Sequence, residues 1–128
     1  MARILVIDDD ESNADVIKLI LQQERHEVMD INTAKLIPFA IKRFHPDVIV
    51  MDILLDNGDG REICNLLKAK TKTRNIPVLL ITAMLEQQAT AKQSRADVLM
   101  YKPFDYTVLS RNVQDLVRKN VRGKNQLF

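Results

Sequence analysis

The chain has 128 residues, 46% of them hydrophobic, which is enough for one domain with a hydrophobic core and too few for two. Its 19 basic and 17 acidic residues give a net charge of +2, so composition predicts neither a nucleic-acid-binding nor a membrane-binding surface. A single cysteine, Cys64, excludes an internal disulfide, and no signal peptide or membrane span is recognisable, so a cytoplasmic protein is expected.

Short apolar segments alternate along the chain with longer segments of helical period. The predicted strands are Ile4–Ile7, Val28–Ile31, Val48–Met51, Val78–Ile81 and Val98–Met100, and the helices that follow them are 12–24, 35–44, 59–70, 85–94 and 106–119. Strands that are apolar throughout and alternate with helices indicate a parallel sheet covered on both faces. The predicted fold is a three-layer α/β domain of (βα)₅ type over residues 1–120, followed by a short tail at 121–128.

Local signals refine the helices. Asp59 and Asp105 are good N-caps for the third and fifth helices. Pro38 cannot stand in a helix interior, so the second helix is expected to hold it in its first turn. Cys64 lies among apolar neighbours, which favours a buried thiol over a reactive one.

Polar side chains directly follow four of the predicted strands. They are Asp8, Asp9 and Asp10 after the first strand, Asp52 after the third, Thr82 after the fourth, and Tyr101 and Lys102 after the fifth. Ligands of open parallel sheets bind at the carboxyl ends of the strands, so these side chains are predicted to meet at one edge. Taken singly, each has a structural explanation: Asp10 can start a helix, Thr82 can cap one, and Lys102 can be a surface charge.

Asp52 gives the strongest signal, because it interrupts apolar sequence, and an ionised carboxylate there is costly unless it is paired, hydrogen-bonded or metal-bound. Clustered carboxylates repel one another unless a hard cation lies among them, which predicts Mg²⁺. Zinc would need His or Cys, and His26 and His45 lie far from this edge in the predicted layout. With its charge offset, Asp52 is suited to attack phosphorus while a lysine and a hydroxyl stabilise the transferred phosphoryl oxygens.

Residues 2–119 resemble the receiver domain of two-component response regulators. Four motifs carry the resemblance in the family's order: ILVIDDDE, PDVIVMD, LLITA and YKPF. The resemblance implies a doubly wound, flavodoxin-like sheet of order 2-1-3-4-5 with Asp52 as phospho-acceptor. A cis Lys102–Pro103 bond is also implied by it.

The same resemblance assigns roles around Asp52. It implies that Mg²⁺ is bound directly by Asp9, Asp52 and the backbone carbonyl of Leu54, and through water by Asp8. It further implies that the phosphoryl group meets Thr82 and the backbone amide of Ala83, and that Lys102 pairs with it.

Four features depart from the family pattern. Asp56 stands where the family usually has Pro, and Leu99 replaces its switch aromatic. Arg25 and Arg95 occupy helix-end positions that are usually Gly, where a left-handed cap would be mildly strained. The segment leading to YKPF is about two residues shorter than usual, which predicts a shortened fourth helix.

A signalling domain is therefore expected rather than an enzyme, one that assists its own phosphorylation and dephosphorylation. The expected donor is a histidine kinase or histidine phosphotransfer protein, and the downstream partner is a protein of unknown identity, with no direct binding of nucleic acid or membrane. The length suits a stand-alone receiver. Output is expected through the fourth helix, fifth strand and fifth helix, which would also serve for a homodimer, and Tyr101 is a candidate to replace the missing aromatic.

Two other functions stay open at the level of sequence. An aspartate-nucleophile phosphatase of related architecture typically needs a second carboxylate two residues after the nucleophile, and Leu54 occupies that place. An unphosphorylated interaction scaffold with a degenerate site is disfavoured by the complete set of site residues, although Asp56 and Leu99 keep it open.

Overall fold

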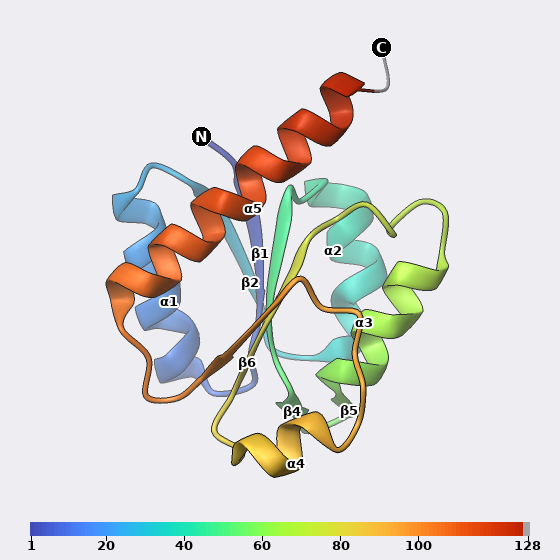
Figure 1. The fold of residues 1–128 in the computed structure, drawn as a ribbon. Coiled ribbons are helices and arrows are strands. Elements are labelled where there is room, and N and C mark those ends of the chain that lie inside the picture. Colours follow the sequence, from blue (N-terminus) through green and yellow to red (C-terminus); the bar gives the residue numbers. More distant parts are fainter. Residues whose placement is uncertain (127–128) are drawn as a thin grey trace.

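The computed structural model describes the backbone of residues 1–126 and side chains up to residue 120. Its main sheet contains β1 (Arg3–Ile7), β2 (Glu27–Ile31), β3 (Val48–Asp52), β6 (Val78–Thr82) and β7 (Val98–Tyr101). All neighbours are parallel and the order is β2-β1-β3-β6-β7 (Figure 1). This confirms the predicted order 2-1-3-4-5, and each strand agrees with its predicted range to within one residue at either end.

Helices cover both faces of this sheet (Figure 1). They are α1 (Glu11–Gln23), α2 (Ile37–Phe44), α3 (Gly60–Ala69), α4 (Glu86–Thr90) and α5 (Tyr106–Gln126), with a 3-10 turn, η1 (Ala34–Leu36), before α2. The side chains of β1 alternate between the two layers, since Ile4 packs with Leu109 of α5 on one face and Leu5 packs with Ile37 of α2 on the other. The three-layer architecture is therefore confirmed.

The predicted local signals at helix starts are also confirmed. The Asp59 carboxylate accepts a hydrogen bond from the backbone N–H of Arg61 at 2.9 Å, and Asp105 caps α5 in the same way. Pro38 lies in the first turn of α2. Cys64 is buried, and desolvation raises the pKa of its thiol to about 11, so the thiolate is disfavoured.

Of the two left-handed helix ends predicted at Arg25 and Arg95, one is confirmed and one is wrong. Arg25 has φ 66° and therefore adopts the left-handed conformation expected of a Gly position. The same expectation for Arg95 is wrong, because the preceding helix ends earlier: α4 spans only Glu86–Thr90 rather than 85–94. Instead, the backbone N–H of Arg95 donates to the side chain of Asn65 at 2.8 Å. The expected shortening of the fourth helix is thus confirmed.

Two further elements differ from the sequence-based expectation. A short antiparallel pair, β4 (Leu54–Leu55) and β5 (Gly58–Asp59), follows β3, so the loop after Asp52 is a hairpin. At the other end, α5 continues to Gln126, and the tail predicted from residue 121 begins inside this helix. No helix in residues 1–126 is long and apolar enough to cross a membrane.

Candidate functional site

The site lies at the carboxyl edge of the sheet, where parallel pairing brings four strand ends together. Asp8 and Asp9 follow β1, Asp52 ends β3, Thr82 ends β6, and Lys102 follows β7. The edge lies where the chain order reverses between β1 and β3, which is where ligands of open α/β sheets bind.

Asp52 is held on both of its oxygens. Its side chain is 9% exposed, Oδ2 accepts from Lys102 Nζ at 2.7 Å, and Oδ1 accepts from the backbone N–H of Leu54 at 3.0 Å. Lys102 is in turn fixed by its own backbone, whose N–H donates to the carbonyl of Thr82 at 2.8 Å. The ammonium of Lys102 and the backbone amide of Leu54 therefore offset the desolvation cost of placing a carboxylate at the end of a buried strand.

The acidic pair divides into a buried and a more exposed member. Asp8 is 3% exposed and accepts hydrogen bonds from the backbone N–H of Asp10 at 2.9 Å and from Asn13 Nδ2 at 2.6 Å. Burial raises the pKa of Asp8, repulsion from Asp52 adds to this, and the two hydrogen bonds only partly oppose it. A cation bound beside Asp8 would therefore stabilise its ionised carboxylate.

The loop after β3 is tied to the acidic pair. The backbone N–H of Asp56 donates to Asp9 Oδ2 at 2.8 Å, which holds the β4–β5 hairpin against the end of β1. The hydrogen-bonded carboxyl of Asp9 also raises the pKa of Asp56. The acidic replacement of the usual Pro thus adds a carboxylate directly beside the site.

Thr82 is completely buried, and its Oγ1 accepts from the backbone N–H of Met84 at 3.0 Å. A hydroxyl that accepts in this way keeps its own proton for donation to another group. Ala83, which separates the two residues, is exposed at the same edge.

The donor set fits a magnesium ion better than a transition metal. Among the described residues, no three His, Cys, Asp or Glu side chains already stand together as a metal-binding group. Mg²⁺ needs only one or two carboxylates and completes its shell with water and phosphate oxygens. Asp8, Asp9 and Asp52 have carboxylate oxygens of this kind at the same edge, and a cation there would favour the ionised form of Asp8, whose pKa is raised by burial.

Gly60 was missed as a site residue, although its place after the turn sequence DNGD was a signal. A Cβ at this position would lie 2.5 Å from the backbone carbonyl oxygen of Asp52, and the Gly60 N–H donates to the carbonyl of Ile53 at 2.7 Å. Only glycine allows the start of α3 to pack this closely against the acceptor strand. Asn13, the partner of Asp8, was also missed, since nothing in its sequence context distinguishes it from a surface residue.

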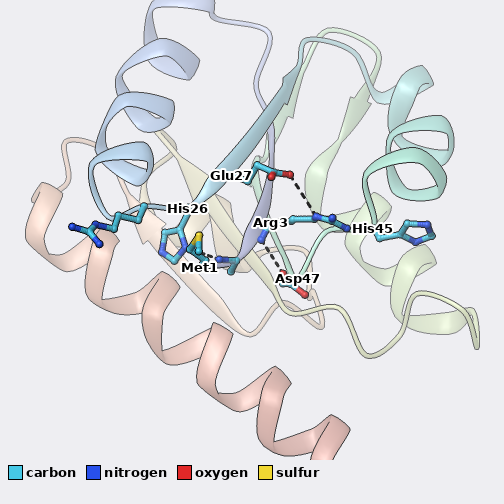
Figure 2. Close-up of a pocket in the computed structure, with 8 residues that line it drawn as sticks. Met1, Arg3, His26, Glu27, His45 and Asp47 are labelled. Atoms are coloured by element: carbon cyan, nitrogen blue, oxygen red, sulfur yellow. Dashed lines mark hydrogen bonds and ion pairs between the residues drawn. The ribbon is translucent and has the colours of Figure 1, made fainter.

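The two histidines lie at the opposite edge of the sheet, as expected. They line a hollow of about 520 Å³ with the N-terminal residues (Figure 2). The guanidinium of Arg3 contacts the Glu27 carboxylate at 3.5 Å, and the backbone N–H of Arg3 donates to the Asp47 carboxylate at 2.8 Å (Figure 2). His26 Nδ1 accepts from the backbone N–H of Ala2 at 3.2 Å, so His26 has a packing role there.

Together, the doubly wound parallel sheet and the acidic site at its carboxyl edge define a flavodoxin-like α/β domain with a cation-favouring site. The family model described as the response regulator receiver domain matches residues 4–114, and the chain belongs to this family. Members are signalling domains of two-component systems that interact with histidine kinases, become phosphorylated and generally bind Mg²⁺ at the phosphorylation site.

Individual relatives agree with this membership. The chain is 32% identical over 125 residues to the DNA-binding dual master transcriptional regulator RpaA of Synechocystis, covering 95% of this chain and 52% of that protein. It is 37% identical over 122 residues to the response regulator PleD of Caulobacter vibrioides, covering 91% and 26%. The chain thus spans about half the length of the first relative and about a quarter of the second.

Solved structures of receiver domains share the fold. The receiver domain of a signal transduction histidine kinase from Syntrophus aciditrophicus superposes with a TM-score of 0.87 at 26% identity, covering 93% of this chain and 92% of that one. The receiver domain of the Francisella response regulator 1452 gives a TM-score of 0.83 at 26% identity, with 93% and 98% covered.

Proposed function

We propose that this domain accepts a phosphoryl group on Asp52 from a histidine kinase or histidine phosphotransfer protein, in a Mg²⁺-dependent reaction. The observation that carries the proposal is the pairing of the Asp52 carboxylate with Lys102 Nζ at 2.7 Å, beside the buried hydroxyl of Thr82. A carboxylate oxygen of Asp52 attacks phosphorus, the bond from phosphorus to the donor imidazole nitrogen breaks, and the imidazole leaves with that electron pair.

The neighbouring residues have separate roles in this proposal. Lys102 holds the acceptor in the resting state and pairs with the phosphoryl oxygens after transfer. The Thr82 hydroxyl and the Ala83 amide donate to the same oxygens, where negative charge gathers during transfer. These groups occupy neighbouring strand ends, so they are placed before the donor arrives.

Asp8, Asp9, Asp52 and the backbone carbonyl of Leu54 are proposed to hold Mg²⁺. When bound, the ion offsets the carboxylates and the incoming phosphoryl charge, which otherwise repel each other. Asp9 is already fixed by the backbone of Asp56, and Asp8 by Asn13.

The proposal is tested with acetyl phosphate as donor. Intact mass should show one phosphoryl adduct with Mg²⁺ present, and none with excess chelator or in Asp52→Asn, which should remain folded because the amide nearly preserves the shape of the carboxylate. The adduct should be labile to base. Labelling that persists in Asp52→Asn or without the cation would overturn the assignment.

The two other candidate functions receive less support. The side chain of Leu54, two residues after Asp52, is apolar and cannot supply the second acid or base of an aspartate-nucleophile phosphatase. A permanently unphosphorylated scaffold would have no need of the partly buried Lys102–Asp52 pair. The mass experiment excludes the scaffold if the protein takes the label. Release of inorganic phosphate from excess acetyl phosphate identifies a phosphatase, which turns over the donor continuously.

Output is proposed to leave the site through Tyr101 and the surface of α4, β7 and α5, which also offers a face for a homodimer. Tyr101 is paired with Thr82 in the ladder and packs with Leu99 against the core cluster that includes Ala89 of α4. Structures with and without a beryllium fluoride mimic should show Tyr101 and the 85–94 segment moving together with Thr82. Movement of Thr82 alone would contradict this route.

A further inference from the structure

A groove between α2 and α3 lies away from the phosphorylation edge. Its volume is about 500 Å³ and its floor is apolar, formed by Ile37, Pro38, Ile41 and Leu67. Lys42, Lys70 and Lys72 also line it, and all three are exposed. The groove thus combines an apolar floor with a border of positive charge.

The positive charge extends over both walls of the groove. Residues 31–46, which contain α2, and residues 63–76, from the second turn of α3 onward, include no Asp or Glu but have seven cationic residues: Lys35, Lys42, Arg43, Lys68, Lys70, Lys72 and Arg74. The one carboxylate of α3, Glu62, lies in its first turn, away from the groove lining, and pairs with Lys92. Lys68 is paired with Asp97 at 2.9 Å, whereas Lys42, Lys70 and Lys72 form no ion pair with any carboxylate of the described residues. Lys42, Lys70 and Lys72 therefore give the groove a positive charge that no carboxylate of its lining offsets.

Helix dipoles explain only part of this pattern. Lysines stabilise helix C-termini, and Lys42 lies in the last turn of α2 while Lys70 is the C-cap of α3. Lys72 lies beyond the end of α3 and gains little from its dipole, since the effect falls off within one turn. A recognition role accounts for all three lysines, because they surround the same apolar floor.

We propose that this groove binds an acidic amphipathic segment of a partner protein. Apolar side chains of the segment would enter the floor at Ile41 and Leu67, and flanking Asp or Glu would face the lysines, the usual arrangement of an amphipathic helix in a groove. Nucleic acid fits less well, because its phosphates gain nothing from an apolar floor. A bilayer also fits less well, because a flat surface cannot enter a concave site.

The groove is lined by α2 from its first turn, at Ile37 and Pro38, to His45, and by the C-terminal end of α3 with the residues that follow it. No lining residue belongs to the phosphorylation site, and Asp52 lies at the other end of α3, beside its start. Binding should therefore not depend on phosphorylation. A constitutive partner would in this way be recruited independently of the switch, and the inference stands whether or not Asp52 is the acceptor.

Selection from a random-peptide display library against the intact protein tests the proposal. The selected sequences should be amphipathic and rich in Asp and Glu, and a labelled representative should bind at least about tenfold more weakly to Lys70→Glu/Lys72→Glu. The matched control is Arg95→Glu/Arg111→Glu, which changes the net charge equally but lies outside the groove lining and outside both cationic segments. It should bind like the wild type, as should Asp52→Asn.

Backbone amide shifts from NMR should change around Ile41, Leu67 and Thr73 when the peptide is added. The proposal is overturned if the selected sequences show no acidic bias, or if both double variants lose binding equally. It is also overturned if groove-dependent binding appears with duplex DNA or phosphatidylserine vesicles and not with peptide.

Discussion

Replacement of Arg61 by Met is expected to loosen the attachment of α4 to the rest of the domain. The guanidinium of Arg61 is nearly buried and binds both oxygens of Asp59, with Nη2–Oδ2 at 2.7 Å and Nε–Oδ1 at 3.0 Å. Its Nη1 donates to the carbonyls of Gln88 and Ala89 in α4, at 2.9 and 3.1 Å. Since Asp59 pairs with Leu54 in the hairpin, one side chain joins the loop after Asp52 to α4.

The size of the stability loss expected for Arg61→Met follows from the burial of this ion pair. Removing one partner of a buried, hydrogen-bonded ion pair costs about 3–5 kcal/mol, because the remaining charge and carbonyls lose their donors. The lower end applies here, since Asp59 keeps the backbone N–H of Arg61 and Lys92 Nζ at 3.4 Å, and its side chain is 18% exposed. We therefore expect Arg61→Met to lower the free energy of unfolding by about 3 kcal/mol.

Urea unfolding measures this loss, and hydrogen exchange locates it. Amides of residues 86–95 should exchange faster in Arg61→Met, while those of β1 and β3 lose protection only in proportion to global stability. Lys92→Met is the matched control, because the Lys92 side chain is exposed and its ion pairs with Glu62, at 2.9 Å, and Asp59, at 3.4 Å, should together contribute less than about 1 kcal/mol. A loss below about 0.5 kcal/mol in Arg61→Met, or unchanged exchange in 86–95, would refute the proposed tether.

Three further predictions concern other parts of the domain. Burial alone would raise the pKa of Asp97, but hydrogen bonds from a backbone amide and two lysines outweigh it and lower the pKa. The stabilisation by ionised Asp97 is therefore complete above the unfolded-state pKa of about 4 and is lost as the pH falls through the pKa of the folded state. The urea midpoint of the wild type should accordingly fall more steeply on acidification than that of Asp97→Asn, and equal slopes would contradict this. Gly60→Ala should destabilise the fold and slow labelling of Asp52 by acetyl phosphate, because the new Cβ would clash with the backbone carbonyl oxygen of Asp52. A variant with wild-type stability and labelling rate would show that this close packing is not required. Leu54 and Met84 lie two residues after Asp52 and Thr82 and are both apolar, so neither can orient a hydrolytic water at the phosphoryl group. Leu54→Asn and Met84→Glu should each shorten the lifetime of the phosphorylated state, followed by intact mass; unchanged decay would exclude water positioning as the controlling factor.

The strands and the site edge were predictable because they depend on short-range pattern. Uninterrupted apolar runs identify strands buried on both faces, and the residue after each run must lie at the carboxyl edge once the sheet is parallel. Asp52, Thr82 and Lys102 therefore meet as predicted. The family motifs supplied the remaining assignments, such as the cis bond before Pro103, which spacing alone does not predict.

Features that depend on tertiary contacts were not predictable in the same way. Near its end, α4 is contacted by Arg61, which donates to the carbonyls of Gln88 and Ala89 but lies far from α4 in sequence and resembles an ordinary surface residue of an amphipathic helix. The left-handed conformation expected at Arg95 was wrong because the helix stops before it. Helix α5, in contrast, continues to Gln126 through Gly123, a residue type that usually marks a helix end. Helix boundaries thus depended on partners that the local sequence does not reveal.

Mapping the phosphorylated residue tests the central claim most directly. The protein is labelled with acetyl phosphate and Mg²⁺, reduced with borohydride to convert an aspartyl phosphate to homoserine, digested and sequenced by mass spectrometry. The account predicts homoserine at position 52 and unmodified aspartate at positions 8, 9 and 56. Homoserine at any of those three positions, or none in a sample that carries the intact-mass adduct, would contradict the assignment of Asp52 as the acceptor.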